Sequence, residues 1–101
     1  MTAIAPSSSI ALSGMRAATS GLQVRANNIA NLATEGFQRS VPVNQATAGG
    51  VVGQVQQADG QGSDLVDDMV GTLTERTAFQ ANARVLRAAD DSIGSLLDVL
   101  A

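Results

Sequence analysis

The sequence has no cysteine and no histidine, and these two absences exclude most kinds of catalytic and metal site. The chain has no thiol nucleophile, no imidazole base, no disulfide and almost none of the usual zinc ligands. Its carboxylates stand in adjacent pairs, such as Asp67 with Asp68 and Asp90 with Asp91. Adjacent residues of a helix point to different faces, so these pairs are not expected to share one site. We therefore predict no enzymatic activity, no cofactor and no metal.

Aromatic and charged residues are also scarce. Phe37 and Phe79 are the two aromatic residues, and charged residues make up 15% of the chain against 45% apolar residues. That balance is too hydrophobic for a disordered chain. Yet 101 residues rich in Ala, Val and Leu bury only a modest fraction of their surface alone. The remaining apolar surface predicts partner chains.

Lysine is absent, so all six basic residues are arginine, and nine acidic residues give a net charge of −3. This balance disfavours nucleic acid or an anionic membrane as a partner. Residues 1–50 hold three arginines and one glutamate, whereas residues 51–101 hold three arginines and eight acidic residues. Since the two halves have opposite net charge, we expect them to attract one another, within a molecule or between neighbours.

Long apolar runs are missing too. Nothing approaches the roughly 20 apolar residues of a membrane-spanning helix. Residues 1–12 lack the basic start of a cleavable signal peptide, and Pro6 with the serines at 7–9 interrupts any apolar stretch. If the protein leaves the cytoplasm, we expect a route without a cleaved signal peptide.

Two helical segments are predicted on either side of a middle rich in Gly and Gln. From about Ser7 to Ala33, apolar residues recur at alternating steps of four and three, which indicates a helix with near-heptad spacing. Gly14 and Gly21 lie on a neighbouring row, where each costs about 1 kcal/mol relative to Ala. Either that face needs a close backbone approach, or the helix is only conditionally stable. The apolar row is Ala11, Met15, Ala18, Leu22, Ala26, Ile29 and Ala33.

Gly36 is expected to follow the end of this helix with positive φ, which glycine adopts without steric cost. Phe37 would then contact Leu32 in a Schellman motif. The alternative is that Gly36 is an ordinary loop glycine and Phe37 begins a strand.

Residues 37–57 alternate in polarity on either side of Thr47–Gly50, so a short β-hairpin is possible. Pro42 removes a backbone donor, which requires its strand to be an edge strand. Residues 58–63 are expected to be a flexible connection.

Residues 64–100 carry the strongest helical signal. Asp64 can cap the N-terminus, and Asp67 and Asp68 place negative charge in the first turn, where the helix dipole favours it. At 1.5 Å per residue the helix would extend about 55 Å, so it must project or bundle with neighbours. The main row is Leu65, Thr72, Phe79, Leu86, Ile93 and Leu100, with Met69, Ala83 and Leu97 beside it and Val66, Val70 and Leu73 widening its start.

Arg76 and Asp90 interrupt the row of Met69, Ala83 and Leu97. One interpretation places both at the solvated margin of the apolar stripe. The other makes them salt-bridge partners between subunits.

Asn27, Asn28 and Asn31 stand within five positions near the end of the first helix, although Asn is a poor helix former. Either the helix end frays and the amides are solvated, or the amides bind neighbouring segments and fix their register.

The stretch ANNIANLATEGFQR at residues 26–39 resembles the N-terminal signature of the flagellar rod and hook family. Residues 64–100 resemble that family's C-terminal hallmark, in which an opening like Leu65 to Val70 leads through an aromatic-x-Ala-Asn-Ala motif, here Phe79 to Ala83, to an Ala-Asp-x-x-Ile segment. The two matches together cover about half of the chain and stand in the family's order.

The resemblance implies a structural subunit of the bacterial flagellar basal body. In that family the terminal helices pair and pack with neighbouring subunits into a helical tube that transmits torque. Members leave the cell through the flagellar type III export apparatus without a cleaved signal peptide. The implied partners are copies of the chain, neighbouring rod proteins and the export apparatus, with no nucleic acid and no small-molecule substrate, and the implied location is the periplasmic rod.

The middle of the chain is shorter than in the family, whose hook and distal-rod members insert large β domains there. The run Gly49 to Val55 resembles a remnant of the Gly-Gly-Val strand of proximal-rod proteins. The chain is therefore most similar to a shortened proximal-rod protein of the C type. A soluble helical-hairpin adaptor or export chaperone, which would bind an amphipathic helix of another protein, is the alternative function.

The expected fold is mainly α, with two long terminal helices forming an antiparallel coiled-coil-like hairpin and a short β-hairpin or irregular segment between them. The expected parts are residues 1–36 with the N-terminal helix and signature, the linker 37–63, and the C-terminal helix 64–101. The residues expected to form the assembly interface are Met15, Leu22, Asn27, Asn28, Ile29, Asn31, Gly36, Phe37, Leu65, Met69, Leu73, Phe79, Asn82, Leu86, Ile93 and Leu97.

Overall fold

The computed structural model describes residues 7–58 and 64–100. Helix α1 (Ser7–Ala30) is followed by strands β1 (Ser40–Thr47) and β2 (Gly50–Gln57) and by helix α2 (Leu65–Leu100). The prediction of a mainly helical fold with a short β-hairpin between two helices is therefore confirmed. The flexible connection predicted at residues 58–63 lies, apart from Ala58, outside the described residues.

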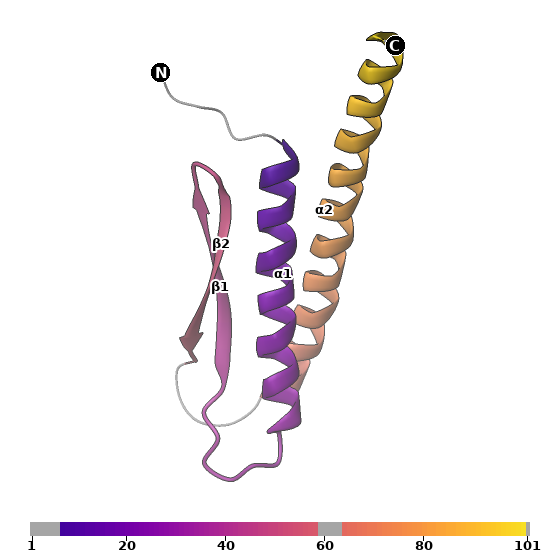
Figure 1. Ribbon diagram of the computed structural model, residues 1–101. Coiled ribbons are helices and arrows are strands. Elements are labelled where there is room, and N and C mark those ends of the chain that lie inside the picture. The colour runs from indigo at the N-terminus through magenta and orange to yellow at the C-terminus, as the bar shows by residue number, and fades with distance from the viewer. Residues whose placement is uncertain (1–6, 59–63, 101) are drawn as a thin grey trace.

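The hairpin and α2 both pack on α1, and the two helices run antiparallel (Figure 1). The molecule measures 63 × 29 × 14 Å along its principal axes. Figure 1 shows the C-terminal part of α2 projecting beyond α1, as its predicted length required. Neither described helix has a stretch long and apolar enough to cross a membrane.

The start of α2 follows the predicted capping pattern. Asp64 Oδ1 accepts a hydrogen bond of 3.0 Å from the backbone N–H of Asp67. This bond satisfies one of the donors that the first turn of a helix leaves free. Asp64 therefore fixes where α2 begins and which residues occupy its first turn.

The end of α1 differs from the prediction. The helix ends at Ala30, and the N–H of Leu32 bonds to the carbonyl of Ile29, so the last turn tightens to a three-residue step. Phe37 donates its N–H to Thr34 at 3.3 Å, not to Leu32, so no Schellman motif forms. Gly36 has the expected positive φ, 73°, within the separate turn from Thr34 to Phe37.

The hairpin pairs Ser40 with Gln57 at one end and Thr47 with Gly50 at the other. The sheet has two strands, so both are edge strands. Pro42 therefore meets the requirement that its strand be an edge strand. Because an isolated hairpin is only marginally stable, its contact with α1 matters. Ser13 Oγ accepts the N–H of Val51 at 3.0 Å, and Gly53 lies directly over Ala17.

The two helices meet where glycines of α1 face polar side chains of α2. Ala11 and Ala18 of the predicted α1 row are buried, whereas the large residues of that row are not fully buried. Gly14 lies against Asn82, where a Cβ would come within 2.6 Å of Nδ2, and Gly21 lies against Glu75, where a Cβ would come within 2.5 Å of the carboxyl carbon. Of the two interpretations of these glycines, the structure supports the close backbone approach. The buried apolar residues of the described chain are Ala11, Ala17 and Ala18.

The predicted rows of large residues lie beside this contact. Met15, Leu22 and Ile29 of α1 and Phe79 and Leu86 of α2 are half-buried. Glycines of one helix leave room for polar side chains of the other, so these faces pair and the large apolar residues lie at the flank. The remaining large residues of the predicted interface on α2 are exposed, namely Leu65, Met69, Leu73, Ile93 and Leu97.

Candidate functional site

A cluster of two arginines and two aspartates joins α1, β1 and α2 near the place where α1 ends and α2 begins. Arg25 comes from the last turns of α1, Arg39 from the residue before β1, and Asp67 and Asp68 from the first turn of α2. We call these four residues, together with Asn28, the junction. Its charges confirm, within one molecule, the attraction predicted between the two oppositely charged halves of the chain.

Asp68 is the centre of the junction and is 1% exposed. Arg39 donates from Nε to Asp68 Oδ2 at 3.1 Å and from its terminal nitrogen to Oδ1 at 2.7 Å, a two-point contact between guanidinium and carboxylate. Arg25 reaches Asp68 Oδ1 at 3.2 Å and Asp67 Oδ2 at 2.7 Å. Arg39 also pairs with Asp67.

This geometry corrects one sequence expectation. Asp67 and Asp68 are adjacent and were expected to point to different faces, yet both carboxylates bind the same two arginines. The long guanidinium side chains approach from two other segments and span the angle between the carboxylates. The two positive and two negative charges balance, and their ion pairs hold α1, the start of β1 and α2 together.

Asn28 connects the junction to the hairpin. Its Nδ2 donates to Ser40 O at 2.7 Å and to Asp68 Oδ1 at 3.1 Å, and its Oδ1 accepts the N–H of Ser40 at 3.1 Å. This buried amide binds neighbouring segments, as one of the two interpretations proposed. Asn31 instead donates from Nδ2 to Asn27, and its Oδ1 accepts a hydrogen bond from Thr34 Oγ1, at the end of α1.

The ion pairs shift the titration of both aspartates in the same direction. Hydrogen bonds from Arg25 and then Arg39 hold the pKa of Asp67 below its usual range. Burial alone would raise the pKa of Asp68, but hydrogen bonds from Arg39, Asn28 and Arg25 outweigh it and lower the pKa. Hydrogen bonding to Asp68 likewise raises the pKa of Arg39. Arg39, Asp67 and Asp68 are therefore charged at neutral pH.

Glu75 has the opposite character. Its carboxylate lies over Gly21 between the helices, and burial raises its pKa, although the positive charge of Arg25 partly opposes that shift. The folded state therefore disfavours the ionised form of Glu75. Its pairing with Gly21 fixes the spacing of the helices at some electrostatic cost.

We expect these shifts to give two separable pH effects on unfolding. A lowered carboxyl pKa contributes stability that is lost as pH falls below about 3.9, the unfolded value. A raised pKa contributes stability at acid pH that is lost as pH rises through the folded pKa. The wild type should thus lose stability in acid, and Glu75→Gln should be more stable than wild type near pH 7 but not near pH 3. Urea unfolding at both pH values measures this, and a Glu75→Gln gain that persists near pH 3 would contradict it.

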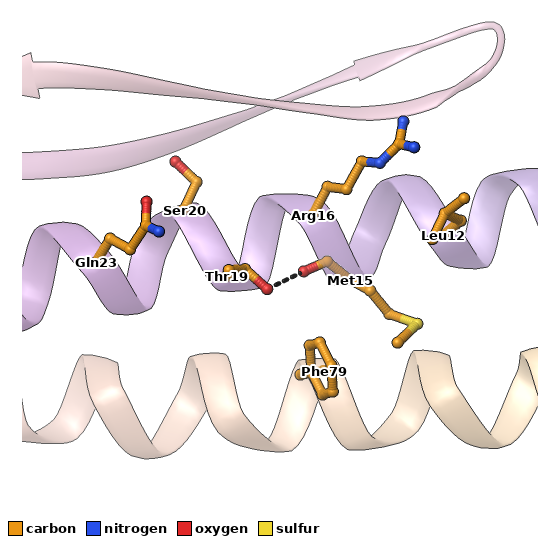
Figure 2. Close-up of a pocket in the computed structure, with 7 residues that line it drawn as sticks. All are labelled: Leu12, Met15, Arg16, Thr19, Ser20, Gln23 and Phe79. Carbon is orange, nitrogen blue, oxygen red and sulfur yellow. Dashed lines mark hydrogen bonds between the residues drawn. The ribbon is translucent and has the colours of Figure 1, made fainter.

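An apolar groove follows the flank of the helix pair. Figure 2 shows Phe79 rising from α2 toward Met15 of α1. Both residues line a hollow of about 340 Å³. A second hollow of about 240 Å³ is lined by Ile29, Met69, Thr72 and Leu73. We call these two hollows the groove. Its apolar lining residues are Leu12, Met15, Ile29, Met69, Leu73 and Phe79, and its polar ones are Arg16, Thr19, Ser20, Gln23 and Thr72.

Helical geometry places Met15 on the side of α1 away from the hairpin. Ser13 and Ala17 contact the hairpin, and Met15 lies two residues from each, about 200° around α1. Arg16 and Ser20 line both the hollow at Met15 and a further one against β2, so the α1 edge of the groove reaches the hairpin.

The first part of the chain is similar to a known protein family. Residues 9–38 match the family model of the flagella basal body rod protein. The match covers most of α1, the junction residues Arg25 and Asn28 and the turn at Gly36. Its members are structural rod proteins and not enzymes. No curated protein matches the chain.

The flagellar rod match divides the predicted interface residues in two. Met15, Leu22, Asn27, Asn28, Ile29, Asn31, Gly36 and Phe37 lie inside it. The eight residues predicted on α2 lie outside it. Of these, Phe79, Met69 and Leu73 join Met15 and Ile29 at the groove, Asn82 lies against Gly14, and Leu65, Leu86, Ile93 and Leu97 line neither hollow.

Sequence reasoning missed the junction as a unit. Arg25 and Arg39 were not among the predicted interface residues, and Asp67 and Asp68 were assigned only to the helix dipole. A signal was present, because Arg25 and Asn28 lie three residues apart on one face of α1. Only the antiparallel pairing of α1 with α2 reveals that this face meets the first turn of α2.

Proposed function

We propose that this protein is a structural subunit of the bacterial flagellar basal-body rod. The observation that carries the proposal is the match of residues 9–38 to the flagellar rod family. The match includes Asn28, through which α1 holds both the hairpin and α2. In this proposal assembly is the whole biochemical activity of the protein.

Assembly proceeds by coupled folding and polymerisation. The small-residue contact between α1 and α2 buries little apolar surface, and most large residues of α2 stay exposed. The helices reach full order when neighbouring subunits cover those residues. A helical tube of interlocked helices then transmits torque.

The finer assignment follows the same resemblance. The short β-hairpin in place of a large inserted domain fits a shortened proximal-rod subunit of the C type. Its partners are then other copies of the chain and neighbouring rod proteins in the periplasm. Export proceeds through the flagellar type III apparatus without a cleaved signal peptide.

The groove also favours a second candidate, a soluble adaptor or export chaperone that binds an amphipathic helix of another protein. Sedimentation at high concentration separates the two functions. An adaptor stays a small discrete oligomer, whereas a rod subunit forms filaments or a poorly ordered monomer.

The rod function is tested by incorporation of alanine variants into basal bodies. Leu86 is half-buried and Ile93 extends its row at a step of seven residues. We expect Leu86→Ala with Ile93→Ala to block incorporation, because truncating an aliphatic side chain that becomes buried costs about 2–5 kcal/mol in every subunit. Immunoblots of purified basal bodies and of the culture supernatant measure this, with secreted but unassembled protein expected.

The matched controls are Arg87→Ala and Asp91→Ala on the same stretch of α2, both at exposed positions. Each is expected to incorporate normally. Absence of the unmodified protein from basal bodies would refute the rod function, and blocked incorporation of the controls alone would show that α2 docks through its polar face.

A further inference from the structure

The contact between α1 and α2 repeats every seven residues. Gly14, Gly21 and Asn28 stand at this spacing on α1. Each meets a polar side chain of α2, and these side chains have the same spacing in the opposite direction. The partners are, in the same order, Asn82, Glu75 and Asp68. A contact with this repeat can fit again after one helix slides along the other by seven residues, about 10.5 Å.

A slide of α2 past the end of α1 would keep both glycine contacts filled. Gly21 would meet Asn82, a side chain that already fits over Gly14. Gly14 would meet Ala89, whose methyl group is smaller than the side chain it replaces. We call this arrangement the slid register. A slide in the opposite direction would leave the end of α1 with no part of α2 opposite it, because α2 begins at Leu65.

The slide would also put Glu75 at the place that Asp68 occupies now. It would then face the three residues that donate hydrogen bonds to Asp68, namely Arg25, Arg39 and Asn28. At its present place Glu75 lies over Gly21, where burial raises its pKa. The slid register therefore gives a poorly solvated carboxylate two arginine partners.

Two features of the contact do not repeat, and they favour the present register. The slide would replace Asp67 by Thr74, so the two arginines would keep one carboxylate instead of two. It would also set Ala78 where Gly71 now leaves room for Arg25. The junction and Gly71 together therefore hold α2 at its present place on α1.

The slid register would cover a different part of α2. Gly14 lies against Asn82 and α1 begins seven residues earlier, so Ser7 now lies opposite Ala89. After the slide Ser7 would lie opposite Leu96, which is 65% exposed at present. Because burial of an aliphatic side chain is favourable, this contact offsets part of what the junction loses.

We propose that α2 packs on α1 in two registers seven residues apart, and that the junction selects between them. Loss of the junction, or a side chain at Gly71, shifts the population to the slid register. There the first turns of α2 pass beyond Ala30, and the stretch around Leu96 comes to lie against α1. The junction thus decides which end of α2 is open to other molecules. Both registers belong to one molecule, so the slide does not depend on the rod function.

Distances between two spin labels test the slide in the purified full chain, which has no native cysteine. Ala26→Cys and Leu97→Cys place one label on each helix, both at exposed positions. Along the helix axis the two sites are about 40 Å apart in the present register and about 30 Å apart in the slid register. Electron–electron double resonance should give the longer distance when no other residue is changed.

Asp68→Ala and Gly71→Ala are the variants expected to shift the register. In each, a peak about 10 Å shorter should appear at the expense of the longer one. Gly94→Ala is the matched control and should keep the longer distance alone, because a Cβ there meets nothing within 4 Å. A label pair at Met69→Cys and Leu97→Cys, both on α2, should give the same distance in every variant.

Three results would overturn the proposal. The first is the longer distance alone in both Asp68→Ala and Gly71→Ala. The second is a broad spread of distances between the two helices in both variants, because α2 would then have left α1 instead of sliding along it. The third is a shorter peak of equal size in Gly94→Ala, because the register would then not depend on the junction.

Ser92→Phe provides a second readout, because it obstructs the slid register alone. After the slide this position would lie opposite Ala11, which is 2% exposed and leaves no room for an aromatic ring. In the present register it lies beyond the start of α1 and is exposed. Added to Asp68→Ala or to Gly71→Ala, Ser92→Phe should abolish the shorter peak. Persistence of that peak would contradict a slide of seven residues.

Discussion

Replacing Asp68 by Ala should lower the free energy of unfolding by about 3–5 kcal/mol, the usual cost of removing one partner from a buried ion pair. Asp68 accepts hydrogen bonds from Arg39, Arg25 and Asn28. Without its carboxylate, two guanidinium groups stay close together in a largely buried site with only Asp67 to balance them. Urea unfolding followed by circular dichroism at pH 7 measures the change.

Two other aspartates provide graded controls for Asp68→Ala. The Asp67 side chain is 51% exposed, so Asp67→Ala should cost about 1 kcal/mol or less because solvent screens its pairs. Asp91 is exposed, and Asp91→Ala should change stability by no more than about 0.5 kcal/mol. Equal effects at Asp68 and Asp91 would show that the junction does not hold α1 to α2.

Gly71→Ala should destabilise the protein by about 1–3 kcal/mol, the range for inserting volume into a packed contact. A Cβ at Gly71 would collide with the guanidinium of Arg25. A flexible arginine usually moves aside, but this one is held by Asp67 and Asp68. The same urea titration should show the loss.

Gly94→Ala is the matched control on the same helix. A Cβ at Gly94 meets nothing within 4 Å, so this variant should gain up to about 1 kcal/mol from helix propensity. The two glycine variants therefore have opposite expected signs. Stabilisation by both would mean that Arg25 is not fixed by the aspartates.

Much of the fold could be predicted because its causes are local. The alternation of residues 37–57 indicated the hairpin, the Asp64 cap marked the start of α2, and Gly36 indicated a positive φ. Each depends on backbone dihedral preferences and on hydrogen bonds within a few residues. The end of α1 was predicted wrongly because a Schellman motif and a tightened last turn are alternative ways to end a helix. The structure has the tightened turn at Leu32.

The candidate site was predicted only in part. Asn28 was identified because Asn is a poor helix former, and every large apolar residue of the groove except Leu12 was identified from spacing, since periodicity shows which residues share a face of a helix. Periodicity does not show which of two faces packs inward. The apolar rows were expected to form the contact between the helices, yet of the α1 row only the alanines Ala11 and Ala18 are buried, and Gly14, Gly21 and Gly71 face side chains of the other helix.

The sequence by itself determined the helices, the hairpin, the excess of apolar surface and the opposite charge of the two halves. The tertiary structure alone decided which faces meet, because close packing of two backbones depends on side-chain size at positions far apart in the chain. It also decided that Arg25, Arg39, Asp67 and Asp68 form one cluster. That cluster exists only where the antiparallel pairing and the path into β1 bring three separate segments to one point.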